Sequence, residues 1–254
     1  MNRKECTEQK MQELFHSHAA GNEGTDPEFM QILQGYIFGD VCHIGSLDNR
    51  MRELVTITVL TVLSTLPQLK SHVQAGLNVG CTPVEIREAV YQCAPFIGFP
   101  KTLNAIGTMN EVFAENGIEL PLENQGTLST DKERFEKGLA IQKPVYGDEI
   151  KDRYTYLPGD FANAVPRFLT ELCFGDFSTR TGMDGKTREL LTVAMLAAMG
   201  GTQVQVKSHV FGALEVGNTK EEIVCALVHA SGYMGIPRLF NALNACRDLL
   251  ADNE

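Results

Sequence analysis

Two pairs of residues in this 254-residue chain have the types and spacing of an acid–base site. Glu53 is followed 19 residues later by His72, and Glu189 is followed 20 residues later by His209. Histidine changes its charge near neutral pH, so it suits a proton-transfer step. A neighbouring carboxylate would hold the imidazole in one tautomer. These four residues are therefore the candidate catalytic residues.

A structural role explains the same pattern. A buried His can hydrogen-bond a Glu to hold two helices together, and a Glu in the first turn of a helix is favoured by the helix dipole. Arg52 and Arg188, which precede the two Glu residues, fit structural ion pairs. His229 and Tyr233 are candidates for lining the same cavity as substrate-binding residues, although core packing explains them equally well. The residues alone leave both interpretations open.

Both pairs lie in an internal repeat. Residues 70–100 and 207–237 align without a gap, and 13 of the 31 positions are identical. A repeat of this size indicates a duplicated structural unit. We divide the chain into a first repeat at 1–118, a polar linker at 119–130 and a second repeat at 131–254.

Hydrophobic patterns predict an all-α fold. Residues 49–64 are apolar on nearly every side, as in a buried central helix. Strand is an alternative for so β-branched a run, but the second copy is rich in Ala, Leu and Met, which favour helix. A helix is predicted at 67–79, and Thr82 and Thr219 each begin a capping box. The segment DKERFEKGLAIQKPVYG reads as a helix with no close match in the first repeat.

Composition narrows the class of protein. Hydrophobic residues make up 43% and charged residues 21%, as in a soluble globular protein. The net charge of -10 argues against a nucleic-acid partner. No apolar run is long enough to span a membrane, and the first residues are too polar for a signal peptide. Seven cysteines without regular spacing then favour a cytoplasmic protein.

The order of motifs resembles the carboxymuconolactone decarboxylase family, which includes the alkylhydroperoxidase D-like proteins. Each copy reads FGD, then GxLD or GMD, REL, an apolar helix, KSHV, GxTxxE and GxPxxxNA. The resemblance covers essentially the whole chain. It implies a tandem duplication of an alkylhydroperoxidase D-like helical bundle that assembles further. Apolar stripes at 29–38 and 165–174 agree with assembly, and we expect a homotrimer.

The peroxidase branch of that family carries a motif that this chain only partly keeps. The motif is Glu, eleven residues, Cys, two residues, Cys, three residues, His. The Cys positions fall on Thr65 and Gln68 in the first repeat, and on Thr202 and Gln205 in the second. A peroxidatic cycle needs a thiolate and a resolving thiol, so peroxidase activity is the disfavoured alternative.

The family's other chemistry implies a lyase that needs no metal or organic cofactor. Its substrate would be a small carboxylated lactone or a related organic acid. Family members often carry an Arg in the stretch that reads FGDFSTRTGMD here, which places Arg180 as a clamp for a substrate carboxylate. The first copy has Ile44 at that place, so the second copy is the better candidate for the active site. A non-catalytic oligomeric binding protein is the third interpretation.

Overall fold

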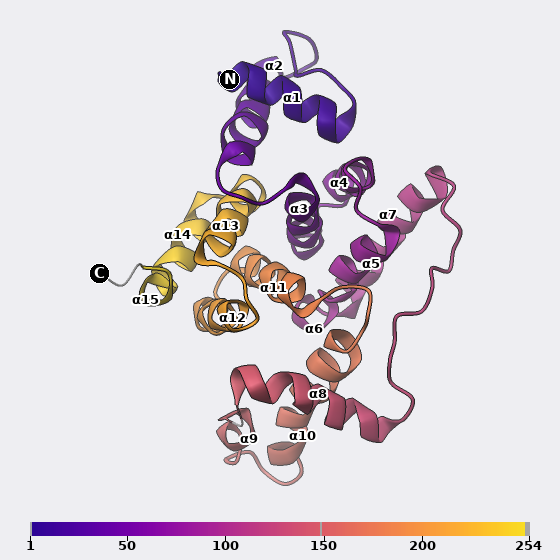
Figure 1. Ribbon diagram of the computed structural model, residues 1–254, viewed down its shortest axis with the longest axis vertical. Helices are drawn as coiled ribbons and strands as arrows, with labels where there is room; N and C mark the ends of the chain where they lie inside the picture. Colours follow the sequence, from indigo (N-terminus) through magenta and orange to yellow (C-terminus); the bar gives the residue numbers. More distant parts are fainter. Residues whose placement is uncertain (1, 148, 252–254) are drawn as a thin grey trace.

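The predicted all-α architecture is confirmed. The computed structural model describes residues 2–147 and 149–251, and these fold into helices without a strand (Figure 1). The two repeats meet where α3 (Asn49–Leu63) packs against α11 (Gly185–Met199) in the middle of the molecule. Each repeat surrounds its central helix with further helices.

The first repeat contains, besides α3, the elements α1 (Arg3–Phe15), α2 (Pro27–Gln34), the π-helical η1 (Gly35–Asp40), the short η2 (Val41–His43), α4 (Leu66–Asn78), α5 (Pro83–Tyr91), α6 (Ala94–Ile97) and α7 (Phe99–Glu115). Residues 116–130 then run along the outside of the molecule without helix. The second repeat contains, besides α11, the elements α8 (Asp131–Tyr146), α9 (Glu149–Arg153), α10 (Phe161–Phe168), the π-helical η3 (Leu169–Ser178), α12 (Gln203–Glu215), α13 (Lys220–Met234), α14 (Ile236–Ala245) and α15 (Arg247–Leu250).

The central helices begin at side-chain caps. Asp48 accepts a hydrogen bond from the Met51 amide at 2.8 Å, and Asp184 accepts one from the Thr187 amide at 2.7 Å. α3 is buried from Arg52 to Val62, although it carries three threonines. Their hydroxyl groups donate to the carbonyl oxygens four residues earlier, so no buried hydroxyl lacks an acceptor in this helix.

Both predicted capping boxes are confirmed. Thr82 accepts from the Glu85 amide while the Glu85 side chain accepts from the Thr82 amide, and Thr219 and Glu222 repeat the arrangement. These caps fix the first turns of α5 and α13. The two helices carry equivalent residues of the repeat to the seam between the central helices.

The helix after the linker has no close sequence match in the first repeat, and yet it has a structural counterpart there. α8 packs on η3 as α1 packs on η1. Arg3 reaches Asp40 of the first FGD motif with Nε 3.0 Å from Oδ1, and Arg134 reaches Asp176 of the second at 2.8 Å. α1 and α8 are therefore equivalent elements, although their sequences share little.

Glycine in each FGD motif lets the two helices approach each other closely. A Cβ on Gly39 would lie 2.9 Å from the carbonyl oxygen of Arg3, and a Cβ on Gly175 would lie 2.5 Å from that of Arg134. The helix backbones touch at these points, so the contact depends on the glycine and on one arginine.

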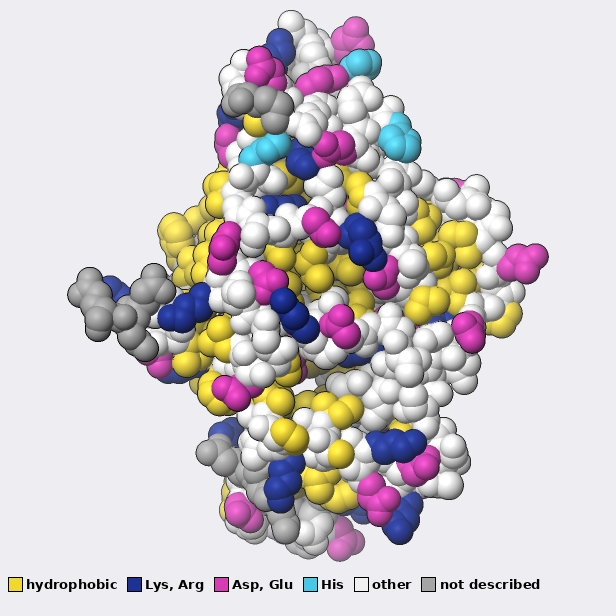
Figure 2. Space-filling view, viewed as in Figure 1, with side chains coloured by type: hydrophobic (Ala, Val, Ile, Leu, Met, Phe, Trp, Pro, Cys, Tyr) yellow, Lys and Arg dark blue, Asp and Glu magenta, His cyan; other side chains and the backbone are white. Residues whose placement is uncertain are grey.

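One hydrophobic core joins the two repeats, and a smaller cluster lies under α1. The stripe predicted at 29–38 is only partly covered within the chain, because Ile37 and Phe38 are buried whereas Phe29 is 63% and Ile32 is 66% exposed. Figure 2 shows further hydrophobic side chains on the surface near the middle of the molecule. The homotrimer stays a prediction. In the described ranges, no helix combines the length and hydropathy needed to cross a membrane.

Candidate active site

The second repeat brings its predicted acid–base pair together. Glu189 lies in the second turn of α11 and His209 in the middle of α12, and these two helices pack against each other. Nδ1 of His209 is 2.8 Å from Oε2 of Glu189. The two side chains are 20% and 15% exposed, so both remain accessible.

Tyr146, the last residue of α8, completes this pair. Its hydroxyl group donates to Oε2 of Glu189 at 2.9 Å and lies 2.9 Å from Nδ1 of His209. Because Nδ1 faces two oxygens, it carries the proton, and Nε2 is the ring nitrogen that a ligand can reach. Burial, followed by the charge of Glu189, raises the pKa of Tyr146, so the side chain is a neutral phenol.

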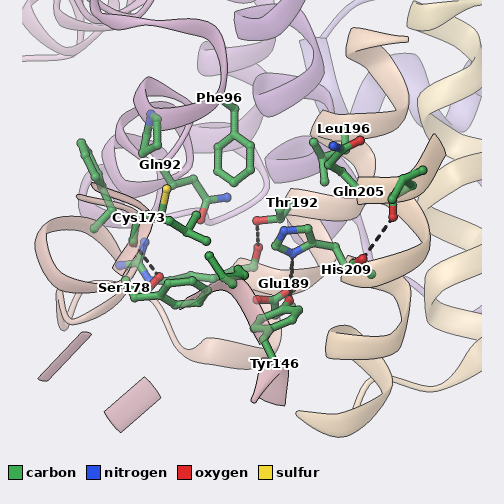
Figure 3. A pocket seen from close by; sticks show the side chains of 18 of the residues that line it. Gln92, Phe96, Tyr146, Cys173, Ser178, Glu189, Thr192, Leu196, Gln205 and His209 are labelled. Atoms are coloured by element: carbon green, nitrogen blue, oxygen red, sulfur yellow. Dashed lines mark hydrogen bonds and ion pairs between the residues drawn. The ribbon is translucent and has the colours of Figure 1, made fainter. Parts of the chain in front are cut away.

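A cavity of about 320 Å³ opens onto this group (Figure 3). Glu189, His209 and Tyr146 form one part of its wall, and Gln92 and Phe96 enter from the first repeat. The Phe96 ring lies with its centroid 6.1 Å from that of His209. The site therefore depends on both repeats of the chain.

The equivalent pair in the first repeat is closed off. Nδ1 of His72 is 2.7 Å from Oε2 of Glu53, but the two side chains are only 8% and 1% exposed. Phe15 and Tyr233 pack edge-on against the His72 ring, with centroids 5.4 and 5.2 Å away. Phe15 ends α1 as Tyr146 ends α8, and it lacks the hydroxyl group.

His229 and Tyr233 lie beside this closed pair. Nε2 of His229 is 2.8 Å from the Thr56 hydroxyl, and burial, with smaller contributions from Arg52 and His72, lowers the pKa of His229 to about 3. The expectation that His229 and Tyr233 line one cavity with His209 is wrong, because neither lines the cavity at His209. α13 crosses onto α3, so its side chains reach the opposite repeat.

Arg180 also lies away from the cavity at His209. Its Nε and Nη2 each lie 2.8 Å from an oxygen of Glu88, a carboxylate that is 0% exposed. A fully buried carboxylate requires a paired cation, and Arg180 meets that requirement from the other repeat. The expected substrate clamp is thus an ion pair between the repeats.

Sequence reasoning missed Tyr146, Gln92 and Phe96, and it assigned Arg188 to an ion pair only. Arg188 does contact Glu88 with Nη2 at 3.1 Å, but it also lines the cavity. A signal for Phe96 existed in the duplication. Phe96 occupies the place in the first repeat that Tyr233 occupies in the second, because both precede a GxP motif by two residues.

The cavity does not offer a reactive thiol. Cys173 lines the wall, and burial raises the pKa of its thiol to about 11. Gln205, at the family's second Cys position, lines the cavity too. Across residues 2–147 and 149–251, no three His, Cys, Asp or Glu side chains gather as a metal-binding group. The Glu–His–Tyr group is thus the candidate acid–base group of this cavity.

Comparison with known proteins agrees with the duplication. The pattern of the carboxymuconolactone decarboxylase family matches residues 27–111 and again 163–248. A crystal structure assigned to a gamma-carboxymuconolactone decarboxylase subunit from Burkholderia xenovorans LB400 shares the fold. The TM-score is 0.54 at 18% identity, and the match covers 96% of each chain.

Curated relatives match about half of this chain. A 4-carboxymuconolactone decarboxylase from Acinetobacter baylyi is 27% identical over 122 residues, which is 48% of this chain and 90% of the relative. A nitrosuccinic acid decarboxylase from Metarhizium robertsii is 28% identical over 118 residues, which is 46% of this chain and 82% of the relative. Each relative thus has about the extent of one repeat.

Proposed function

The chain belongs to the carboxymuconolactone decarboxylase family, and from this premise we propose that it is a cofactor-free decarboxylase of a small organic acid. The observation that carries the proposal is the Glu189–His209–Tyr146 group on the wall of a cavity. Two relatives named as decarboxylases support it. The reaction would take place in this cavity, where the Glu–His–Tyr group comes from the second repeat.

The substrates in the two relatives' names share a chemical feature. Each carries a carboxylate together with a group that can accept an electron pair, a lactone carbonyl in one and a nitro group in the other. Loss of CO2 leaves an electron pair on carbon, and such a group takes it up without a cofactor. We therefore expect a substrate of this class for the cavity at His209.

The chain's own residues would then supply the proton. As the bond between carbon and the carboxylate breaks, its electrons pass into the acceptor group and CO2 leaves. Nε2 of His209 donates a proton to the carbon, and water later restores it, so the reaction consumes one proton. Glu189 stabilises the imidazolium form of His209 before the transfer, because its carboxylate contacts Nδ1 at 2.8 Å.

The test of this function is CO2 release from a panel of acids that carry a lactone, a keto or a nitro group near the carboxylate. Product spectra recorded in D2O should show one deuterium at the carbon that lost CO2. Thiol-dependent consumption of peroxide without CO2 release would instead support a peroxidase. Binding of the acids without turnover would support the binding-protein interpretation.

Tyr146 should position His209. We expect Tyr146→Phe to lower kcat about tenfold or more with little change in KM, because one hydrogen bond to the Glu189 carboxylate is lost. The phenol group is not required to contact the substrate for this effect. Steady-state kinetics of CO2 release measure it.

The first repeat provides the matched control. Phe15→Tyr places a hydroxyl group on the equivalent ring, which packs against His72. We expect no gain in turnover from this variant, since His72 is buried. A histidine ¹⁵N spectrum of Tyr146→Phe should also show an altered Nδ1 environment at His209. An unchanged spectrum together with unchanged kcat would refute the positioning role.

A further inference from the structure

The cavity at His209 has two kinds of wall. Glu189, His209 and Tyr146 form its acid–base part. A second part, the apolar wall, is made of residues from both repeats: Pro95, Phe96, Leu169, Phe174, Phe177 and Leu196. Binding sites for small molecules commonly combine a mostly apolar lining with a few polar groups that fix the orientation of the ligand. The acid–base group thus accounts for only part of what this cavity can bind.

The apolar wall lies close to the acid–base group. The centroid of the Phe96 ring is 6.1 Å from that of His209, and the centroid of Phe174 is 5.7 Å from that of Tyr146. In Figure 3 the Phe96 ring points toward the side chains of His209 and Glu189. A ligand whose reacting carbon lies at His209 therefore also meets these rings.

The volume of the cavity leaves room beside a small acid. At about 320 Å³ it falls within the range of pockets that hold drug-sized ligands, roughly 300 to 1,000 Å³. A small acid alone would leave water against the phenyl rings. Because removing apolar surface from water is favourable, a ligand that also covers these rings binds more tightly.

The duplication shows how this space arises. Ile37 and Cys173 each directly precede an FGD motif, and Gly232 and Pro95 each precede a GxP motif by three residues. In the first repeat Ile37 is 6% exposed, and a Cβ on Gly232 would lie 2.9 Å from its Cγ1, so these two elements are in contact. In the second repeat the smaller Cys173 stands in the place of Ile37, and both Cys173 and Pro95 line the cavity.

We propose that this space holds an apolar ring of the substrate, packed on the apolar wall, while the reacting carbon lies at Nε2 of His209. This inference rests on the proposed function and names its substrate class as an acid that carries an aryl group close to the reacting carbon. The side chain that fills the equivalent space in the first repeat, Ile37, is itself apolar. An aromatic ring suits the wall, because phenyl rings attract another ring in edge-to-face and offset contacts.

The inference is tested by calorimetric titration with hydrocinnamate and with propanoate, which differ only in one phenyl ring. The wild-type protein should bind hydrocinnamate about 10- to 100-fold more tightly than propanoate. Cys173→Ile restores the side chain that the first repeat has at this place. It should weaken hydrocinnamate binding about tenfold or more and change propanoate affinity less than about threefold, because only the ring loses its space.

A second variant removes part of the wall instead of filling the space. Phe177→Ala should weaken hydrocinnamate binding about 3- to 10-fold. Phe211→Ala is its matched control, because Phe211 lies on α12, is 43% exposed and is not among the residues that line the cavity. We expect the control to bind hydrocinnamate as the wild type does, and thermal unfolding checks that all three variants are folded.

Three results would overturn the inference. The first is a wild-type protein that binds no hydrocinnamate, or that binds it no better than propanoate. The second is an unchanged preference for hydrocinnamate in Cys173→Ile. The third is an equal loss of hydrocinnamate affinity in the Phe177 and Phe211 variants.

Binding and turnover separate this inference from the proposed function. A preference for hydrocinnamate that Cys173→Ile abolishes, without CO2 release from any acid, would leave the ring site standing and remove the decarboxylase. CO2 release with the same kcat/KM from acids with and without an aryl group would do the reverse.

Discussion

Replacing His209 with Gln is expected to lower kcat for CO2 release by about 10²- to 10⁴-fold, the usual contribution of a general acid. Gln fills a similar volume and can still meet Glu189 and Tyr146, but it has no transferable proton at neutral pH. The folded state should therefore persist while proton delivery to carbon is lost. Single-turnover measurements of CO2 release, which follow the chemical step directly, give the clearest comparison.

His72→Gln is the control from the other half of the duplication. The His72 side chain is 8% exposed and enclosed by Phe15 and Tyr233, so no substrate can reach it without displacing these rings. We expect turnover close to wild type and a lower melting temperature, because Glu53 is 1% exposed and loses its best partner. Equal kinetic losses in the two variants with unchanged melting temperatures would show two equivalent sites.

The sequence favoured the second repeat as the site, but the argument for it was wrong. The second copy was favoured because Arg180 stands where the first copy has Ile44. In the structure, what separates the sites is the aromatic residue that ends α1 in the first repeat and α8 in the second. Phe15 packs against His72, whereas Tyr146 hydrogen-bonds to Glu189 and lies beside an open cavity.

Local patterns predicted the helices and the two Glu–His pairs well. N-cap residues, capping boxes and an all-apolar central helix act over a few neighbouring residues, so one sequence reveals them. Glu189 and His209 could be paired because the duplication repeats a Glu followed 19 or 20 residues later by a His. The contacts between the two repeats could not be predicted in this way, because they join residues about a hundred positions apart, such as Glu88 and Arg188.

The sequence predicted only part of what Arg188 does. Its role as an ion-pair partner was expected, and the contact with Glu88 is present. Nothing in a sequence reports that two of its nitrogen atoms lack an acceptor, since that depends on which carbonyl oxygens the folded loop turns inward. Arg52 is followed by the same two residues, Glu and Leu, and yet each of its three nitrogen atoms has an acceptor.

Glu88→Gln should cost about 3 kcal/mol or more in free energy of unfolding, because it leaves buried guanidinium groups without their carboxylate. Glu88 comes from the first repeat, and Arg180 and Arg188 come from the second, so this ion pair holds the repeats together. For a chain of this size, such a loss lowers the melting temperature by roughly 6 to 12 °C. Calorimetry at pH 7 measures it.

The pH dependence gives a second measurement of the same interaction. Burial alone would raise the pKa of Glu88, but the hydrogen bonds and charges of Arg180 and Arg188 outweigh burial and lower it. A carboxyl group whose pKa is lower in the folded state stabilises the fold fully above its unfolded pKa. That stabilisation disappears as the pH falls through the folded value. The wild type should thus lose stability on acidification more steeply than Glu88→Gln.

Glu115→Gln is the matched control, because Glu115 contacts Lys70 at 2.6 Å on the surface, where the two side chains are 57% and 41% exposed. Exposed ion pairs contribute about 0 to 1 kcal/mol, so this variant should unfold almost as the wild type does. Similar losses of unfolding free energy in both variants would mean that the buried ion pair of Glu88 stabilises the fold no more than a surface ion pair does. A Glu88 variant with wild-type stability would show that the repeats are held by the apolar contact of α3 with α11 alone.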